Sequence, residues 1–382
     1  MKKSIVFSIC LVSLLSADAL DDIFKNAKVD GYIRGGYQNQ DISGDKSYKS
    51  DSIGGKLHFE TANYNGISAA VSFYTTNKIS NNDGEGIAFF DSDNKSYSIL
   101  GEAYLQGVFG NTTIKLGRQE LDIPFADTDD IGMIPNTFEA GVLINKDIPD
   151  TTIVLAQVQK WAGVDAPKPE EFTKMYNDDS VQTLGITYEG IKDLSLSGWY
   201  YDLKSKNDND LDDISYIEAV YANKINLVNY ELGFQYAKQS HKNAQDAKIN
   251  GASLSIGFEG TGLTLNAAYN KSNDNAADNG FGGGPFFTSC EHLTLAEAGA
   301  DGKATTYGLE WDASGIGLDG VTLGYTNLNL EASNGIESDE DDFVFSYDIK
   351  ENLNLTAIYS DVDDKINNDK FKNTRVFLNY HF

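Results

Sequence analysis

The chain has 382 residues, of which 30 are Lys or Arg and 57 are Asp or Glu, so its formal net charge is −27. Such a charge excludes a protein that binds nucleic acid by neutralising phosphates. The 20 Phe and 21 Tyr residues exclude an acidic disordered chain. The two cysteines, Cys10 and Cys290, are too few for a disulfide framework or a metal site built from thiolates.

The first segment has the pattern of a secretory signal peptide. Lys2 and Lys3 precede an apolar run, and small residues at Ala17 and Ala19 provide two alternative cleavage sites. We therefore predict a signal peptide over residues 1–19 and one exported domain over 20–382. That domain contains no apolar run of the roughly 20 residues that a membrane-spanning helix needs.

From about residue 27 onward the hydrophobic period is two, in segments of roughly ten residues, the length of a tilted transmembrane strand. In one such segment Leu263, Leu265 and Ala267 fall on one face, whereas Thr264 and Asn266 fall on the other. Successive side chains of a strand alternate between its two faces. One face therefore suits lipid and the other suits water.

The pattern predicts 18 strands, an even number, at about 28–38, 51–62, 66–76, 96–108, 111–120, 137–146, 151–160, 180–189, 193–203, 213–222, 229–238, 249–259, 262–271, 304–312, 320–329, 342–348, 352–360 and 372–382. Short turns follow even strands and longer polar loops follow odd ones, as in barrels with short periplasmic turns and long outer loops. All six prolines fall in predicted connections, which suits a residue that cannot donate to a strand ladder. We predict an all-β fold, a single transmembrane antiparallel β-barrel. An exported soluble sandwich or β-solenoid is the alternative, but it gives no reason for the alternating connections.

The third loop, residues 121–136, reads LDIPFADTDDIGMIPN. It carries four acids between two prolines, and its apolar residues would expose much apolar surface if the loop pointed outward. We therefore expect it to fold into the barrel, where its acids would form the pore constriction: Asp122, Asp127, Asp129 and Asp130. The alternative is an ordinary solvated outer loop whose aspartates serve only solubility.

Strand parity places a small set of charges on the lumen wall. Arg34, Lys56 and Arg375 lie on the first, second and last strands, which become neighbours when the barrel closes, so they form one basic track. Glu218 and Glu231 lie roughly opposite and form an acidic wall. This arrangement predicts a transverse field that discriminates solutes by charge. The alternative is a hydrated lumen that simply tolerates charges of both signs.

No motif points to catalysis or to a cofactor. The four His residues lack the spacing of a zinc site, and no nucleophile elbow or phosphate-binding loop appears. We therefore expect no enzyme, no metal site and no cofactor, with a loop hydrolase as a remote alternative. Acidic runs at 81–86, 207–213 and 338–342 could bind Ca²⁺ through oxygen ligands, although none has the EF-hand spacing. Alternatively they are only solvated, or face anionic lipopolysaccharide through divalent cations.

Four segments resemble the OprD-type family of substrate-specific outer-membrane porins: GYIRGGY (31–37), LGRQELDIPF (116–125), MIPNTFEAGVL (133–143) and the terminal aromatic residue Phe382. The resemblance covers most of the domain. It implies an 18-stranded barrel whose third loop is helped by a long seventh loop, here about 272–303 around Phe286. It also implies a basic ladder on the lumen wall, which maps onto Arg34, Lys56 and Arg375. Because the chain has only three Arg, this ladder is short and relies on Lys56 and Lys115.

These observations together predict a porin in the outer membrane of a Gram-negative bacterium, through which small hydrophilic solutes or ions diffuse passively, with a preference for cations. A barrel acting as adhesin or receptor through its loops is the alternative. The expected partners are outer-membrane lipid and lipopolysaccharide, the solutes, and the barrel assembly machinery acting on Phe382. Both a monomer and a homotrimer fit the sequence.

Overall fold

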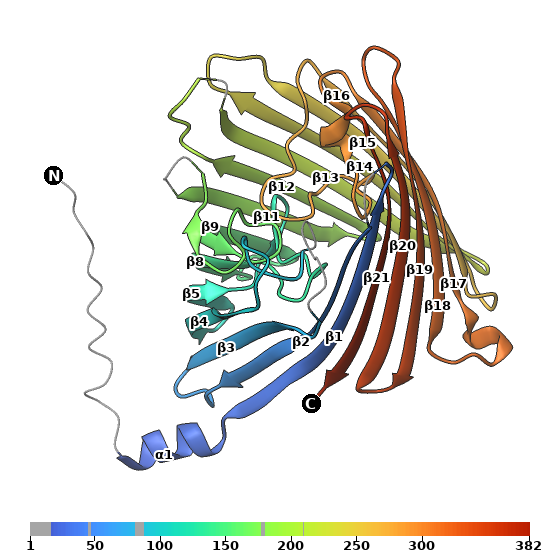
Figure 1. Ribbon diagram of the computed structural model, residues 1–382. Helices are drawn as coiled ribbons and strands as arrows, with labels where there is room; N and C mark the ends of the chain where they lie inside the picture. Colours follow the sequence, from blue (N-terminus) through green and yellow to red (C-terminus); the bar gives the residue numbers. More distant parts are fainter. Residues whose placement is uncertain (1–16, 45–46, 81–87, 177–179, 209) are drawn as a thin grey trace.

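The computed structural model describes residues 17–44, 47–80, 88–176, 180–208 and 210–382. Residues 1–16 of the expected signal peptide and the acidic run 81–86 lie outside this part, and the helix α1 (Ala17–Lys25) precedes the first strand. Eighteen long antiparallel strands close into one barrel (Figure 1). They are β1 (Lys28–Ile42), β2 (Ser47–Glu60), β3 (Ile67–Lys78), β4 (Tyr97–Phe109), β5 (Thr112–Gln119), β8 (Thr137–Asn145), β9 (Thr151–Ala162), β11 (Val181–Ile191), β12 (Leu194–Asp202), β13 (Leu211–Ile225), β14 (Val228–His241), β15 (Ala247–Phe258), β16 (Leu263–Asn273), β17 (Lys303–Asp312), β18 (Val321–Glu331), β19 (Glu337–Lys350), β20 (Leu353–Asp364) and β21 (Asp369–His381).

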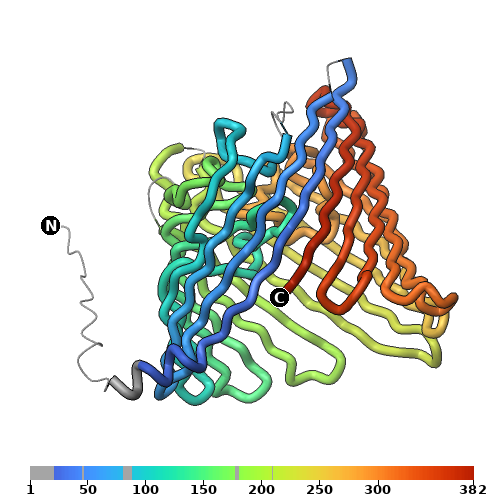
Figure 2. Tube along the Cα trace, turned by 60° about the horizontal axis from the view of Figure 1, so that its bottom comes forward, coloured from blue at the N-terminus to red at the C-terminus, as the bar shows by residue number. Residues whose placement is uncertain are grey.

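Closure of the barrel is achieved by pairing of the first and last strands. β1 pairs with β2 on one side and with β21 on the other, and Arg34 lies opposite Asn379 across the closing pair. Each remaining strand pairs with its neighbours in the chain, and the strands run steeply tilted around the wall (Figure 2). Strand makes up 64% of the described residues, which contain almost no helix. The prediction of an all-β, 18-stranded barrel with short periplasmic turns is therefore confirmed.

Burial alternates along the strands as the period of two requires. Ile33 and Leu57 are 50% and 52% exposed on the outer wall, whereas Arg34 is only 6% exposed on the inner wall. On β21, Leu378 and Tyr380 face outward in the same way. The outer face is apolar because its solvent is lipid. Among the described residues, no helix is long and apolar enough to cross a membrane.

Several loops fold into the lumen (Figure 1), and clusters of buried apolar side chains join them to the wall. Loop 3 (residues 120–136), loop 4 (163–180) and loop 7 (274–302) supply many of these side chains. One cluster joins Phe125 and Phe286 to the strands, and a second gathers around Phe89 and Met133. Burial of these side chains holds the loops in place within the barrel.

One detail differs from the sequence prediction, and two short helices lie within predicted connections. The acidic run 338–342 belongs to β19 instead of a loop, and Ser338, Glu340 and Asp342 are buried on its inner face. The β17–β18 turn, expected over 313–319, contains a 3-10 helix, η3 (Ala313–Ile316). The segment 292–298 remains in loop 7 but forms a short 3-10 helix, η2 (Leu295–Ala298), that starts at a capping box.

Candidate pore constriction

The tip of loop 3 is a small hairpin that crosses the lumen. β6 (Asp122–Ile123) pairs with β7 (Ala126–Asp127), and the turn between them contains Pro124 and Phe125. The proline suits the tight turn because its φ angle is already restricted. The hairpin carries Asp122 and Asp127 directly opposite each other.

An aromatic contact holds this tip against the far wall. The Phe125 ring is 2% exposed and meets the rings of Tyr201 on β12 and Tyr216 on β13 edge-on, with centroids 5.6 and 5.7 Å away. The Tyr201 hydroxyl also donates a hydrogen bond to the Pro124 carbonyl. Phe286 of loop 7 completes the cluster at 5.9 Å. Phe286 is 3% exposed, so it joins the two loops and contacts little solvent.

Loops 3 and 7 are also joined through their backbones. The Phe281 amide donates to the Phe125 carbonyl at 2.9 Å, and the Asp127 amide donates to the Phe281 carbonyl at 3.1 Å. The Gly283 amide donates to the Asp129 carboxylate at 3.1 Å. The two loops therefore form a single unit across the channel.

On the near wall, loop 3 is held by charge. The Arg34 guanidinium on β1 donates two parallel hydrogen bonds to the Asp130 carboxylate, at 2.6 and 2.7 Å. It also donates to the Gly132 carbonyl and to the Asn379 side chain. Such bidentate pairs are strong and specific in direction. The first cation of the basic track is thus bound to one of the acids predicted to form the constriction.

Gly36 allows loop 3 to approach β1 closely. A Cβ atom at Gly36 on β1 would collide with the Met133 sulfur and the Phe89 ring, both of which are buried. Glycine therefore lets loop 3 lie directly on the wall beside Arg34.

The second cation of the basic track has two acidic partners. Lys56 Nζ lies 2.9 Å from a carboxylate oxygen of Glu102 and 2.9 Å from one of Glu120. The Tyr74 hydroxyl donates to Glu120 at 2.7 Å, and the Ser72 hydroxyl donates to Glu102. The Lys56 charge therefore faces one carboxylate of the wall and one of loop 3.

The third cation pairs with loop 7. Arg375 donates to the Glu291 carboxylate, and the Arg375 side chain is 5% exposed. Burial raises the pKa of Glu291, and the facing Arg375 partly offsets this effect. Burial, aided by Arg375, lowers the pKa of His292 to about 4, so this histidine is neutral near pH 7. Glu340 accepts hydrogen bonds from the His292 and Leu293 amides, which fixes loop 7 over β19.

Lys115 differs from the three paired cations. Its Nζ lies 3.8 Å from the centroid of the Tyr104 ring, and among the described residues it has no ion pair. The lumen track of Arg34, Lys56, Lys115 and Arg375 therefore has three neutralised positions and one cation held only over an aromatic ring.

A cavity of about 230 Å³ lies between the loop 3 tip and the opposite wall. Asp122, Asp127 and Glu218 line it together with the Phe125 and Tyr216 rings, and none of its described lining residues is basic. Burial and the neighbouring Asp122 and Asp129 raise the pKa of Asp127. The structure thus brings two of the loop 3 acids together with one residue of the acidic wall.

Glu231, the other residue expected on that wall, lies elsewhere. Its side chain lies on the inner face of β14. There it lines a separate groove, together with Asn229 and Lys224, near the turns between the strands. It therefore lies outside the cavity that contains Glu218.

Loop 4 adds an acid that the sequence analysis did not single out. Asp165 accepts a hydrogen bond from the Asn136 side chain at 2.7 Å. Burial, with the charges of Asp129 and Asp127, raises the pKa of Asp165 to about 7. Glu120 and Glu291 were also missed, because their cationic partners lie far away in the chain. No group of acids, histidines or cysteines among the described residues has the arrangement of a metal site.

A protein-family model described as "outer membrane porin, OprD family" matches residues 80–382 of this chain. This chain belongs to the OprD family. The family places it in the Gram-negative outer membrane, as expected from the sequence. No curated protein matches this porin.

Solved structures share its fold. A BenF-like porin from Pseudomonas fluorescens Pf-5 is 17% identical with a TM-score of 0.80, covering 94% of this chain and 99% of that chain. OccAB4 of Acinetobacter baumannii is also 17% identical with a TM-score of 0.80, covering 93% and 98%. OccK8 (OprE) of Pseudomonas aeruginosa is 15% identical with a TM-score of 0.78, covering 94% and 99%.

Proposed function

We propose that this OprD-family porin is a water-filled diffusion channel for small hydrophilic solutes and ions that prefers cations. The observation that carries the proposal is the acidic cavity beneath the loop 3 tip. Asp122, Asp127 and Glu218 line it without a basic neighbour among the described lining residues. A cation entering such a site replaces part of its hydration with carboxylate oxygens, whereas an anion is repelled.

The ion pairs formed by the basic track also support a preference for cations. A ladder of free cations would attract anions, but Arg34, Lys56 and Arg375 each face a carboxylate within ion-pair distance. Their fields are therefore largely cancelled at the distance of a passing solute. The formal net charge of −27 adds a negative field across the whole molecule.

A planar-bilayer experiment tests this proposal. The protein is reconstituted, and the reversal potential is measured under a salt gradient for the wild type and for the triple variant Asp122→Asn/Asp127→Asn/Glu218→Gln. We expect cation preference in the wild type and a fall in the permeability ratio of about threefold in the variant, the factor given by a loss of ~0.6 kcal/mol of attraction.

The matched control removes three charges outside the lumen. Asp150, Asp319 and Glu351 are exposed in the periplasmic turns, and the triple variant Asp150→Asn/Asp319→Asn/Glu351→Gln should keep the wild-type ratio. An anion-preferring wild type would contradict the proposal. Absence of conductance from folded protein would instead favour an adhesin or receptor that works through its outer loops.

OprD-family porins are channels, and we infer that this chain catalyses no reaction and needs no cofactor. Binding of Ca²⁺ by the acidic runs remains a proposal, and in the run 207–213 residue 209 lies outside the described residues while 211–213 begin β13. The run 81–86 lies outside the described residues, and 338–342 forms part of β19. Recognition of Phe382 by the assembly machinery and a homotrimeric state are also proposals. Phe382 is 52% exposed at the end of β21, where a partner can reach it.

A further inference from the structure

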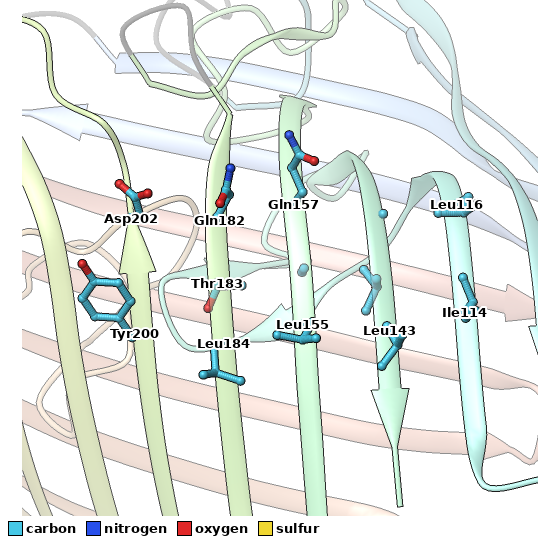
Figure 3. A pocket seen from close by; sticks show the side chains of 13 residues that line it. Ile114, Leu116, Leu143, Leu155, Gln157, Gln182, Thr183, Leu184, Tyr200 and Asp202 are labelled. Carbon is cyan, nitrogen blue, oxygen red and sulfur yellow. The ribbon is translucent and has the colours of Figure 1, made fainter. Parts of the chain in front are cut away.

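The outer wall of the barrel carries a shallow groove of about 640 Å³ across β5, β8, β9, β11 and β12. Its floor is a row of apolar side chains in register. Ile114 faces Leu143, Leu143 faces Leu155, and Leu155 faces Leu184. Figure 3 shows Leu143, Leu155 and Leu184 side by side on neighbouring strands. A row of this kind suits acyl chains.

The next row toward the outer loops is more polar and has a gap. In register it contains Leu116, Gly141, Gln157, Gln182 and Asp202. Gly141 has no side chain, and a Cβ atom there would lie 3.2 Å from Leu116. Figure 3 places Gln157, Gln182 and Asp202 beyond the leucines, toward the top of the view. The groove therefore passes from an apolar to a polar lining in the direction of the outer loops.

Cations lie immediately beyond this row. Arg118 on β5 and Lys160 on β9 flank Glu139 on β8, with nitrogen-to-oxygen distances of 3.7 and 3.9 Å. Their side chains are 34% and 38% exposed. One carboxylate at these distances balances only one of the two cations. Lys174 lies next to Lys160 in register on β10 (Thr173–Lys174), and the Arg118 guanidinium stacks over the Phe172 ring at 4.2 Å.

This arrangement places positive charge at the outer edge of an apolar groove in a protein whose net charge is −27. Long cationic side chains at such an edge keep their charge in the headgroup region while their stems cover apolar surface. The complementary ligand has a phosphate at that level and acyl chains below it.

We propose that this groove binds lipopolysaccharide, the phosphorylated glycolipid of the outer leaflet. Its acyl chains lie over the row Ile114–Leu143–Leu155–Leu184, and a phosphate of its lipid A part binds Arg118 and Lys160. The site is on the lipid-facing wall and is independent of the solute preference of the channel.

The test measures binding of bis-phosphorylated lipid A to the purified full chain in detergent micelles, by native mass spectrometry over a lipid titration. Lipid A without phosphates and phosphatidylglycerol serve as comparison lipids. The double variant Arg118→Gln/Lys160→Gln should bind lipid A about 30-fold more weakly, as expected from a contribution of roughly fivefold, or about 1 kcal/mol, from each cation at an anionic lipid surface.

The matched control is Lys248→Gln/Lys372→Gln. These two lysines are also exposed on strands and ion-paired to an acid, with Asp274 and Asp361 respectively, but they lie away from the groove. The control should bind lipid A like the wild type. Gly141→Phe, which fills the groove, should weaken binding of lipid A with and without phosphates. Unchanged conductance of each variant shows that its barrel is folded.

Three outcomes would overturn the proposal. The double variant could bind lipid A as tightly as the control does. Phosphate-free lipid A or phosphatidylglycerol could bind the wild type as tightly as bis-phosphorylated lipid A. Finally, sedimentation could show that Gly141→Phe separates an oligomer into single chains without changing lipid binding, which would assign the groove to a second copy of the protein.

Discussion

Two of the contacts that hold loop 3 in the lumen are of different kinds. On β1, Asp130 binds Arg34 through charge, whereas on β12 and β13 Phe125 packs between tyrosines. The charged contact holds the loop, and within it the opposite charges of Arg34 and Asp130 cancel each other. The aromatic contact holds the loop without using any carboxylate, so Asp122 and Asp127 beside it line the cavity without a basic partner among its described residues. One loop thus has a neutralised side and an acidic side.

The largest expected effect comes from removing the aromatic contact. Phe125→Ala deletes a ring that is 2% exposed, and such losses typically cost about 3–5 kcal/mol of stability. We expect the loop 3 tip to detach from β13, with higher and noisier single-channel conductance and a weaker preference for cations. Phe343→Ala is the control, because Phe343 is 49% exposed on the outer wall. Quiet wild-type currents from Phe125→Ala would show that the aromatic contact does not hold the loop.

Removing the charged contact should have a smaller effect. Asp130→Asn leaves the buried Arg34 guanidinium without its carboxylate, but the Asp130 side chain is 44% exposed, so we expect a loss of about 1–2 kcal/mol after solvent screening. The uncovered cation should also lower the preference for cations. Thermal unfolding and reversal potentials measure the two effects. Asp122→Asn removes the same charge without breaking an ion pair, so equal melting temperatures for the two variants would contradict this interpretation.

The preference for cations should depend on pH through Asp165 of loop 4. Burial raises the pKa of Asp165 to about 7, so its contribution to stability is present at low pH and is lost as the pH rises through that value. The same ionisation adds negative charge beside Asp129. We expect the preference for cations to increase between about pH 6 and 8 in the wild type. Reversal potentials across this range should be flat for Asp165→Asn, and a persistent step in that variant would assign the titration to another group.

The smallest effect is expected from Glu231. It lies outside the cavity under loop 3, and Lys224 lines the same groove. Glu231→Gln should therefore change the permeability ratio much less than Glu218→Gln does, as measured by reversal potential in the same bilayers. Equal effects of the two substitutions would show that Glu231, outside the cavity, influences passing ions as much as Glu218 does.

The strands were predictable to a large extent because their signal is local. Each of the 18 predicted segments overlaps one barrel strand, since lipid on one side and water on the other impose the same alternation throughout. The exception at 338–342 has a physical reason. Its acids indicate a solvated loop when the sequence is taken alone. In the structure the His292 and Leu293 amides of loop 7 donate hydrogen bonds to the Glu340 carboxylate within the lumen.

The candidate site was less predictable because its contacts are long-range. The sequence indicated which acids and cations face the lumen, but not that Arg34 binds Asp130 or that Arg375 binds Glu291. These partners meet only after the barrel closes and the loops fold inward. Asp165 carries no pattern in its own segment, and only Asn136 and Asp129 around it make it distinctive.

The sequence by itself determined the strand number, the alternation of lipid-facing and water-facing side chains, and the acidic third loop, because each depends on neighbouring residues along the chain. The tertiary structure alone decided which charges are cancelled and which remain. That outcome depends on distances between side chains on different strands and loops, since an opposite charge within about 4 Å neutralises a group that its own segment leaves charged.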